Sequence, residues 1–464
     1  MTEVTAGQSV TLLGQFYDFE GGTLTDLDTT PTIAITAIAT GATALAATAT
    51  GVTHPATGSY GYAWTPASSL TPGAYLATWT GLKTGSPVTA TETITVTAPA
   101  TAEDTNTSLA GVWYATREDV QRALDVKLTA RNSRQIDRAL ESASRDVDDL
   151  CHRKFAPAVG TRYFDWPGSQ NRPSWRLWLD DNELISVTTL VSGGGTIPAT
   201  DYLLEPNRSG PPYNRLEIDL DSTAAYSSGT THQRAIQITG LWGYRNTETS
   251  VGPLAAAVAS TTATTLTVTG AASAELGVGS VLRVDSERML VTGRTMADTG
   301  QNVGGAGLTA QQNSVALAVA DGSAFAVDEV LLVESERMLV VDIAGNTLTV
   351  QRAWDGTVLA AHAAGAGIYA PRTLTVQRGA LGTTAALHAD ASSVVRWDPP
   401  GLVRDLTIAE ALNRVTNELA GYARTRRAGG GLSSNDQALV ARDLPALRQQ
   451  VYNAHGRKGR TRGV

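Results

Sequence analysis

Two pairs of acidic residues recur in the second half of the chain, Asp285 with Glu287 and Glu334 with Glu336. Neighbouring carboxylates can act as a general acid and base, or they can bind Ca²⁺. Each pair here alternates with apolar residues, and an arginine follows each pair directly. This pattern is typical of the solvent-exposed face of a strand on which a carboxylate pairs with the neighbouring arginine. We therefore expect a structural role rather than a catalytic or calcium site.

Two histidines, His362 and His388, follow equivalent Gly-Thr turns. An imidazole in such a place could ligate a metal ion or titrate near neutral pH. No Asp, Glu or Cys recurs with the two histidines at the spacing of a ligand set. We expect each histidine to hydrogen-bond its own loop.

The common motifs of catalysis and phosphate binding are missing from the sequence. It holds no Walker loop, Gly-x-Ser-x-Gly, Cys-x-x-Cys or His-Glu-x-x-His. The glycine-rich stretches at 193–195 and 429–431 lack the strand-to-helix setting that phosphate binding needs. The single cysteine, Cys151, lies on the apolar side of a predicted helix, which favours a small buried side chain over a reactive thiol. We expect no enzyme activity and no catalytic, cofactor-binding or metal-binding residue.

Three tryptophans, Trp166, Trp175 and Trp178, could stack on bases or sugars. They lie in alternating segments that predict a β-hairpin over residues 161–180, with its turn at Pro167-Gly168. Aromatic residues in a hairpin that packs on a helix usually belong to the core, and this is the interpretation that we favour.

An amphipathic helix over residues 132–155 precedes this hairpin and must support it. Apolar residues recur at steps of three and four, and charged residues fill the other side. The predicted apolar stripe consists of Ile136, Ala139, Leu140, Ala143, Val147, Leu150 and Cys151.

The length of 464 residues predicts a multidomain protein. Residues 1–98 show short alternating strands between turn residues, which predict an all-β sandwich. The stretch Gly58-Ser-Tyr-Gly-Tyr-Ala-Trp-Thr-Pro resembles immunoglobulin-like modules of virion and surface proteins. Its aromatic residues follow the strand period, so we expect them in the core rather than in a carbohydrate platform. Residues 99–112 are expected to form a mobile linker.

Helices and strands mix in residues 113–250, which predicts an α+β unit. Thr116 with Asp119 predicts a capping box for a short helix. The helical period returns over 399–455, where Pro445 is expected to kink or split the last helix. We expect these C-terminal helices to complete the core of the α+β unit by packing on the stripe of the 132–155 helix.

A repeat interrupts this unit. Ser-Glu-Arg-Met-Leu-Val occurs at 286–291 and 335–340, and Thr-Leu-Thr-Val-Gln-Arg occurs at 347–352 and 373–378. The order of these halves predicts that residues 255–397 are inserted all-β modules, in which one copy, 313–370, lies inside another copy made of 263–300 and 373–397. The first half extends without a gap to Leu266 against Val315 and Val268 against Leu317.

Charge is spread unevenly along the chain, whose formal net charge is -8. Residues 1–100 hold six acidic residues against one lysine, whereas residues 402–464 hold eleven basic residues against five acidic ones. Such asymmetry indicates an interaction surface toward an acidic protein or nucleic acid. The first residues lack a secretory signal and no stretch is long and apolar enough for a membrane span, so we expect folding in the cytosol and no membrane partner.

Several segments together resemble the head-to-tail connector (adaptor, or head-completion) proteins of long-tailed double-stranded DNA phages, especially those of actinobacteria. The resemblance covers residues 113–464. The segments that carry it are Tyr114-Ala-Thr-Arg-Glu-Asp-Val, Asp148-Asp-Leu-Cys-His-Arg-Lys-Phe, Trp166-Pro-Gly, Gly210-Pro-Pro-Tyr-Asn-Arg, Ile236-Gln-Ile-Thr-Gly-Leu-Trp-Gly-Tyr, the nested modules and Gly456-Arg-Lys-Gly-Arg-Thr-Arg.

The resemblance implies a structural virion protein that is assembled in the host cytoplasm. Its copies would form a dodecameric ring beneath the portal protein and above a tail-side completion or tail terminator protein. Double-stranded DNA would pass through the ring without sequence recognition. The sandwich departs from the minimal adaptor, and we expect it to be an outward appendage. The alternative is a tail-associated host-binding protein that holds a receptor or a carbohydrate.

The basic tail, residues 456–464, is the predicted contact site. It has no apolar residue before Val464, so it should order only on a partner. We favour the portal over DNA, because strong binding of DNA by every subunit of a ring would hinder release of the genome. The predicted contacts are Arg424, Arg426, Arg427, Arg457, Lys458, Arg460 and Arg462.

Overall fold

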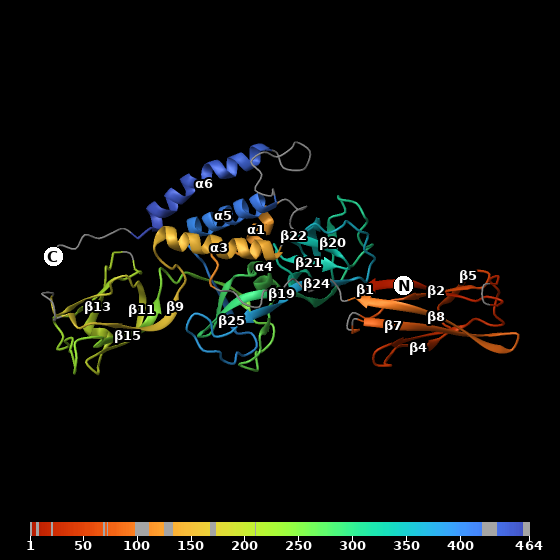
Figure 1. Ribbon diagram of the computed structural model, residues 1–464, viewed down its shortest axis with the longest axis horizontal. Helices are drawn as coiled ribbons and strands as arrows, with labels where there is room; N and C mark the ends of the chain where they lie inside the picture. The colour runs from red at the N-terminus through yellow and green to blue at the C-terminus, as the bar shows by residue number, and fades with distance from the viewer. Residues whose placement is uncertain are drawn as a thin grey trace. The chain divides into compact units, whose positions relative to one another are not determined.

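The protein is mostly β, with 42% of its residues in strands and 18% in helices, and it contains several antiparallel sheets. It divides into two compact units: residues 1–102 with the short segments 332–336 and 366–368, and the remainder of the chain. The computed structural model in Figure 1 describes residues 2–5, 9–19, 22–67, 70–71, 73–97, 111–124, 133–167, 173–208, 210–419 and 434–457.

Two sheets make up the described part of residues 1–102. One has the order β1-β8-β7-β3-β4 and the other β2-β6-β5. The strands are β1 (Thr2–Thr5), β2 (Val10–Gln15), β3 (Thr32–Ala37), β4 (Thr43–Thr48), β5 (Val52–Ala56), β6 (Ser59–Trp64), β7 (Gly73–Lys83) and β8 (Ser86–Thr97).

Alternate residues of both sheets enter one core, as the strand period predicts. The expected core aromatics Tyr60, Trp64, Tyr75 and Trp79 are buried, and Tyr62 is half-buried against the same core. Gly14 on β2 makes room for the largest of them, because a Cβ atom there would lie 2.6 Å from the indole of Trp79. The prediction that these aromatics are core rather than an exposed platform is confirmed.

Four helices of the second unit pack on one another: α1 (Arg117–Ala123), α3 (Ser133–Cys151), α5 (Gly401–Leu419) and α6 (Ser434–His455). The predicted capping box of α1 is confirmed, since Thr116 and Asp119 bond each other's backbone N–H groups. Helix α6 continues through Pro445, so the expected split is wrong.

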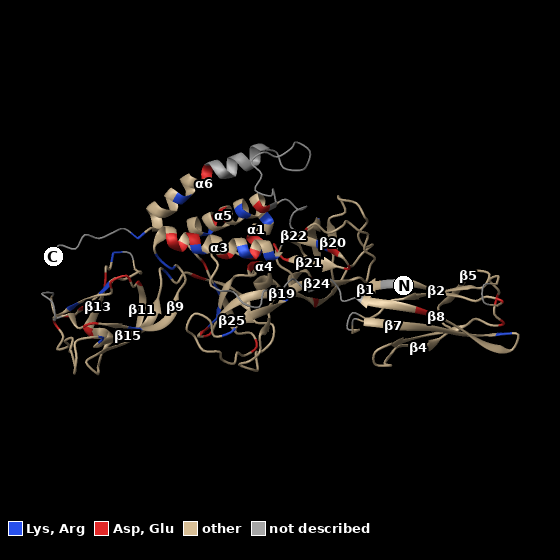
Figure 2. Cartoon of the chain, viewed as in Figure 1, with Lys and Arg blue, Asp and Glu red and all other residues tan. Residues whose placement is uncertain are grey.

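The apolar stripe of α3 is confirmed in all but one position. Ile136, Ala139, Leu140, Ala143, Val147 and Cys151 are buried, and Leu150 is half-buried beside them. Residues of α5 and α6 enter the same core, as predicted for the C-terminal helices. Figure 2 shows charged residues along both α3 and α5. Two ion pairs join these helices, Arg414 with Asp146 and Arg138 with Glu418.

Two small sheets follow α3 in the chain. One has the order β12-β11-β15-β9 and the other β10-β14-β13. Their strands are β9 (Ala158–Phe164), β10 (Arg176–Trp178), β11 (Leu184–Ser192), β12 (Gly195–Ile197), β13 (Tyr202–Glu205), β14 (Arg215–Ile218) and β15 (Ile236–Trp242), with the 3₁₀ turn η2 (Ala199–Asp201) before β13.

The predicted hairpin over residues 161–180 is wrong. Strand β9 pairs with β15, and β10 pairs with β14 of the other sheet. The alternation of the two segments was real, but the hydrogen-bonding partners of both strands come from much later in the chain. Trp166 and Trp175 are half-buried and pack against the core that the two sheets share, which agrees with a core role for these aromatics.

The largest sheet runs β16-β25-β18-β19-β24-β21-β22-β23-β20, with β17 paired to β24. Its strands are β16 (Glu248–Pro253), β17 (Thr265–Thr267), β18 (Val281–Val284), β19 (Glu287–Asn302), β20 (Ala316–Ala318), β21 (Val330–Val333), β22 (Glu336–Ala344), β23 (Thr347–Trp354), β24 (Gly367–Gln377) and β25 (Ser393–Trp397). Helix α4 (Gly270–Glu275) and the 3₁₀ turn η3 (Gly322–Ala324) connect strands of this sheet.

The strand pairing corrects the sequence alignment of the two repeat copies at the N-terminal end of each copy. Leu266 pairs with Leu374, and Leu317 pairs with Leu348, so Leu266 corresponds to Leu317 rather than to Val315. The first copy is two residues longer between its first two strands. That extra length lets it form helix α4 where the second copy has only the turn η3. The ungapped alignment was therefore wrong in this segment.

The segment 255–397 is not a separate body beside the helices. Val278, Val281, Leu290 and Ala380 belong to the same apolar core as α3 and α5. The backbone confirms this contact, because the N–H of Arg117 donates to the carbonyl of Val278 at 3.0 Å. The ends of the segment meet, since the N–H of Leu254 donates to the carbonyl of Ser392 at 2.9 Å. The ends of its inner part, which contains β20 to β23, also meet, since the N–H of Gly365 donates to the carbonyl of Val303 at 2.8 Å.

Replacing residues 304–364 by a short Gly/Ser linker should therefore leave a folded protein with unchanged helix content, because the two ends already meet. Replacing 255–392 should instead give a molten product, because it removes four residues of the helical core. Far-UV circular dichroism and near-UV signals of the two variants test this difference. A folded product from the longer deletion would contradict the shared core.

Candidate functional site

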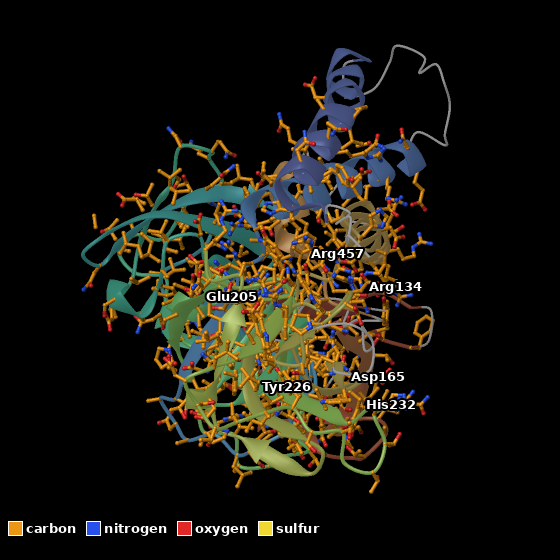
Figure 3. All side chains as sticks on the ribbon, turned by 90° about the vertical axis from the view of Figure 1, so that its left-hand side faces the viewer. Arg134, Asp165, Glu205, Tyr226, His232 and Arg457 are labelled. Atoms are coloured by element: carbon orange, nitrogen blue, oxygen red, sulfur yellow. The ribbon has the colours of Figure 1, made fainter. Side chains whose placement is uncertain are left out.

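Of the predicted contact residues, the structure describes only Arg457. Arg424, Arg426, Arg427, Lys458, Arg460 and Arg462 lie outside the described residues. Arg457 is the first basic residue of the tail and follows α6 directly (Figure 3).

Arg457 is fixed to the body of the second unit. Its N–H donates to the carbonyl of Cys151 at 2.9 Å. Its guanidinium bonds the carboxylate of Asp181 at 3.1 Å and the carbonyl of the same residue at 2.6 Å, and lies 3.8 Å from Glu183. The preceding Gly456 is buried, and a Cβ atom there would lie 2.4 Å from the carbonyl oxygen of Tyr452. Arg457 is thus the root of the tail, contrary to the expectation that the whole tail waits for a partner.

An open hollow of about 400 Å³ surrounds this root, and we call it the tail-root hollow. Its charged lining comes from the end of α3, from β9 and from the loop before β11. The lining residues are Asp148, Asp149, His152, Arg153, Lys154, Ala156, Ala158, Arg162, Asp181, Glu183, Trp242, Gly243 and Arg457.

Two arginines of the hollow lie over aromatic rings. The guanidinium of Arg162 is 4.4 Å from the ring centre of Trp242 and bonds the side chain of Asn182. That of Arg153 is 4.7 Å from the ring centre of Tyr244 and 3.5 Å from Glu183. Burial lowers the pKa of Arg162. Stacking stabilises both guanidinium groups and fixes their planes.

An aromatic junction lies behind the hollow and joins segments that are far apart in the sequence. The ring of Phe155 meets those of Tyr114, Tyr244 and His455 edge to face, with centroids 5.5, 5.4 and 6.1 Å away. Such pairs each add about 0.5–1.5 kcal/mol beyond the burial of their area. Burial, followed by the charges of Arg153 and Arg245, lowers the pKa of His455, which favours its neutral form.

Tyr114 connects the junction to α3. Its hydroxyl donates to Asp148 at 2.5 Å and accepts the N–H of Phe155 at 3.2 Å. Burial, followed by the charge and hydrogen bond of Asp148, raises the pKa of Tyr114, so the hydroxyl keeps its proton as a donor. These two hydrogen bonds orient the end of α3 and the loop at Phe155. The protonated hydroxyl of Tyr114 is not a nucleophile.

Only the first residue of each acidic pair, Asp285 and Glu334, is exposed as expected. Glu287 and Glu336 are both 0% exposed. Both faces of β19 are buried, since Leu290 lies in the core around α3 and Met289 and Val291 lie in a second apolar core. Glu287 accepts two hydrogen bonds from Arg378, at 2.7 and 2.8 Å, rather than pairing with the arginine beside it. Glu287 belongs to one repeated motif and Arg378 to the other, so the recurrence of both residues could have indicated this pairing from the sequence.

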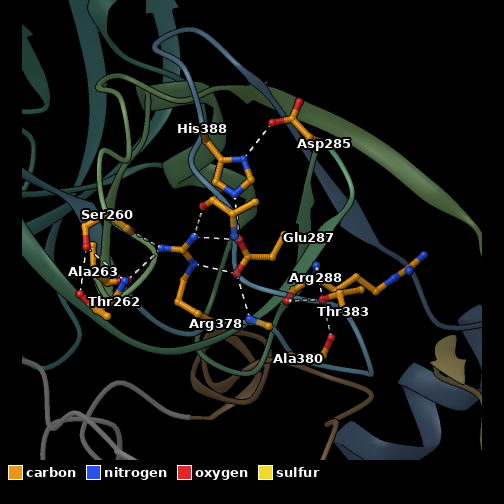
Figure 4. Close-up of polar contacts among 12 residues, drawn as sticks. Ser260, Thr262, Ala263, Asp285, Glu287, Arg288, Arg378, Ala380, Thr383 and His388 are labelled. Atoms are coloured by element: carbon orange, nitrogen blue, oxygen red, sulfur yellow. Dashed lines mark hydrogen bonds and ion pairs between the residues drawn. The ribbon is translucent and has the colours of Figure 1, made fainter.

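His388 does not bond its own loop as expected. His388 lies between two carboxylates, with its Nδ1 2.8 Å from Asp285 and its Nε2 2.9 Å from Glu287 (Figure 4). Together with Arg378 these residues form a buried network, which we call the outer staple. It joins the two halves of the outer copy. No group of three or more His, Cys, Asp or Glu with the geometry of a metal site occurs among the residues that the structure describes.

Cys151 is buried, as expected for a small core residue. Burial raises the pKa of its thiol to about 11, so the reactive thiolate is disfavoured. In the described part of the chain, no helix has the length and apolar character needed to cross a bilayer.

Comparison with protein-family models, curated proteins and solved structures found no match to this chain.

Proposed function

We propose that this chain is a structural protein of a double-stranded DNA phage virion, a head-to-tail connector. Its copies form a dodecameric ring beneath the portal protein, and a tail-side completion or terminator protein binds below. The genome passes through the ring without sequence recognition. In this proposal residues 113–250 and 399–455 form the connector core, and residues 1–98 form an immunoglobulin-like appendage.

One observation carries the proposal. Three of the segments that resemble connector proteins, and the last residues of α6, meet at the aromatic junction through Tyr114, Phe155, Tyr244 and His455. The segments lie far apart in the sequence, so their meeting in one packed cluster supports reading them as parts of one unit. The junction also sets the position from which the basic tail leaves.

A ring requires two different faces on each subunit that complement each other and close on rotation. The helical layer supplies rigid faces for this purpose, because ion pairs fix α3, α5 and α6 to one another. Glu410 of α5 pairs with Arg448 of α6 at 2.5 Å.

One observation favours the host-binding alternative. Tyr17 and Phe19 in the first unit are 48% and 70% exposed, although aromatic side chains are usually buried. Exposed aromatic faces can stack on sugar rings or on a receptor surface.

Negative-stain imaging of the purified protein should show closed rings, alone or with portal protein. A variant without residues 1–108 should form the same rings, since no residue of the first unit's core is needed to complete the core around α3. Elongated trimers would favour the host-binding protein instead. Rings that disappear in the shortened variant would place the first unit in the assembly interface.

A further inference from the structure

The inner copy of the repeat, 313–370, has the same local geometry as the outer copy at the place where the outer copy meets the helical layer. In the outer copy the N–H of Gly279 donates to the carbonyl of Val291 at 2.8 Å. In the inner copy Asp328 makes the same bond to Val340, also at 2.8 Å. Gly279 and Asp328 both have a positive φ, of 99° and 70°. This face of the two copies can therefore be compared residue by residue.

In the outer copy the segment that leads into α1 covers this face. Val278 is 0% exposed, its carbonyl accepts the N–H of Arg117 at 3.0 Å, and its own N–H donates to Glu118 at 2.8 Å. A Cβ atom on Gly279 would lie 2.5 Å from the ring of Trp113. The outer copy thus holds the segment by two hydrogen bonds of its backbone and by an aromatic ring for which only glycine leaves room.

The equivalent face of the inner copy is not covered in this way. Val327, the counterpart of Val278, is 48% exposed, and in the described part of the chain neither its N–H nor its carbonyl has a hydrogen-bond partner. Val330 and Trp354 are half-buried, whereas their counterparts in the outer copy belong to the core around α3. We call Val327, Asp328, Val330 and Trp354 the inner face. It combines exposed apolar surface with open backbone groups, the two features by which the outer copy holds a chain segment.

An open hollow of about 290 Å³ adjoins the inner face, and its lining includes Asp328, Val330, Trp354 and Arg122 of α1. Asp328 is exposed and has no cation within 4.0 Å among the residues that the structure describes. The other carboxylates of the lining each pair with an arginine: Glu118 with Arg294, Asp119 with Arg404, Glu275 and Asp398 with Arg396, and Asp355 with Arg337. Asp328 is therefore the carboxylate that remains for a partner.

Asp328 also decides which segment fits. It stands where the outer copy has Gly279, so its side chain takes the space that the ring of Trp113 fills there. A Lys or Arg at that position of a segment would avoid the clash and pair with the carboxylate. Arg122 is exposed and has no acidic partner in the described part of the chain, so it would repel a run of basic residues. One basic residue among neutral ones fits the hollow best.

We propose that the inner face is a docking site for a segment of a partner protein, which makes the backbone contacts of residues 113–118 and carries a Lys or Arg in place of Trp113. A second copy of this chain does not supply the segment, because its own Trp113 is 3% exposed and lies in the core around α3. The docking site goes beyond the connector function and does not depend on it.

The test uses the full-length protein and two fluorescein-labelled peptides of residues 111–119, one with Trp113→Lys and one with Trp113→Glu. Fluorescence anisotropy should show that the Lys peptide binds about tenfold more tightly, because an attraction to Asp328 replaces a repulsion. In the variant Asp328→Lys this preference should reverse. The matched control is Asp342→Lys, which makes the same change of charge at an exposed residue of the inner copy outside the hollow and should keep the preference.

A second variant guards against misfolding at a residue with positive φ. Asp328→Asn suits this backbone conformation and should weaken binding of the Lys peptide about threefold, while circular dichroism and the melting temperature stay those of the wild type. Equal affinity of the wild-type protein for the two peptides, or a preference that Asp328→Lys leaves unchanged, would overturn the docking site. So would the absence of binding at a peptide concentration of about 1 mM, since such an affinity is too weak for a docking segment.

Discussion

Replacing Glu287 by glutamine should destabilise the outer copy of the repeat by about 3–5 kcal/mol, the usual cost of removing one partner of a buried ion pair. Glu287 is 0% exposed and accepts hydrogen bonds from Arg378, from His388 and from the N–H groups of Gly379 and Ala386 (Figure 4). The amide keeps the volume but loses the charge, so Arg378 would remain buried without a counter-ion. Thermal unfolding, followed by near-UV circular dichroism, measures the loss.

The acid stability of the protein should change in the same variant. Burial raises the pKa of Glu287, but hydrogen bonds from Arg378, from the two N–H groups and from His388 outweigh it and lower the pKa to about 2. A carboxyl with a lowered pKa stabilises the fold above its ordinary value of 4.5, and this contribution is lost as the pH falls toward 2. The shift corresponds to about 3 kcal/mol. The wild-type protein should therefore lose stability between these pH values more steeply than Glu287→Gln.

Two matched variants separate the staple from a general effect of charge. Asp285→Asn changes a carboxylate that is 61% exposed and bonds only His388, so it should cost about 1 kcal/mol or less. Glu336→Gln changes the equivalent residue of the inner copy, which is also 0% exposed, and should cost as much as Glu287→Gln. If Asp285→Asn proves as costly as Glu287→Gln, the charge-burial argument is wrong.

Local periodicity predicted those parts of the fold that depend on burial along one element. The stripe of α3, the capping box of α1 and the alternating core of the first unit follow from the 3.6- and 2-residue periods and from one short-range hydrogen-bond pattern. The hairpin over 161–180 failed, because pairing partners in a sheet are set by the whole topology. Strand β9 finds its partner at 236–242, far along the chain.

The buried charges were missed for a related reason. The alternation around Glu287 suggested one solvent-exposed face, but both faces of β19 are buried, one in the core around α3 and the other in a second apolar core. A carboxylate is tolerated there because Arg378, from the other half of the repeat, supplies its counter-ion. The composition of the tail predicted that it would order only on a partner. Its first arginine is held by Asp181, a residue whose position the sequence of the tail could not reveal.

A second buried ion pair lies on α3, within the polar side that was expected to face water. Asp137 is 3% exposed and binds Arg117, the first residue of α1, through two hydrogen bonds of 2.8 and 2.7 Å. Arg117 is itself 1% exposed, and its N–H donates to the carbonyl of Val278 in the outer copy. The pair therefore lies where α1, α3 and the large sheet meet.

Asp137→Ala should lower the free energy of unfolding by about 3–5 kcal/mol, because it removes the carboxylate that binds the buried guanidinium of Arg117 through two hydrogen bonds. Chemical denaturation followed by far-UV circular dichroism measures this, since α1 and α3 supply much of the helix signal. The double variant Arg117→Met/Asp137→Leu removes both charges and fills the space with apolar side chains, so it should recover most of the loss. If the double variant is as unstable as Asp137→Ala, the junction depends on the geometry of the ion pair itself, and the three elements need its two parallel hydrogen bonds to stay in register. If Asp137→Ala costs less than about 1 kcal/mol, the pair is hydrated in solution and the burial argument fails.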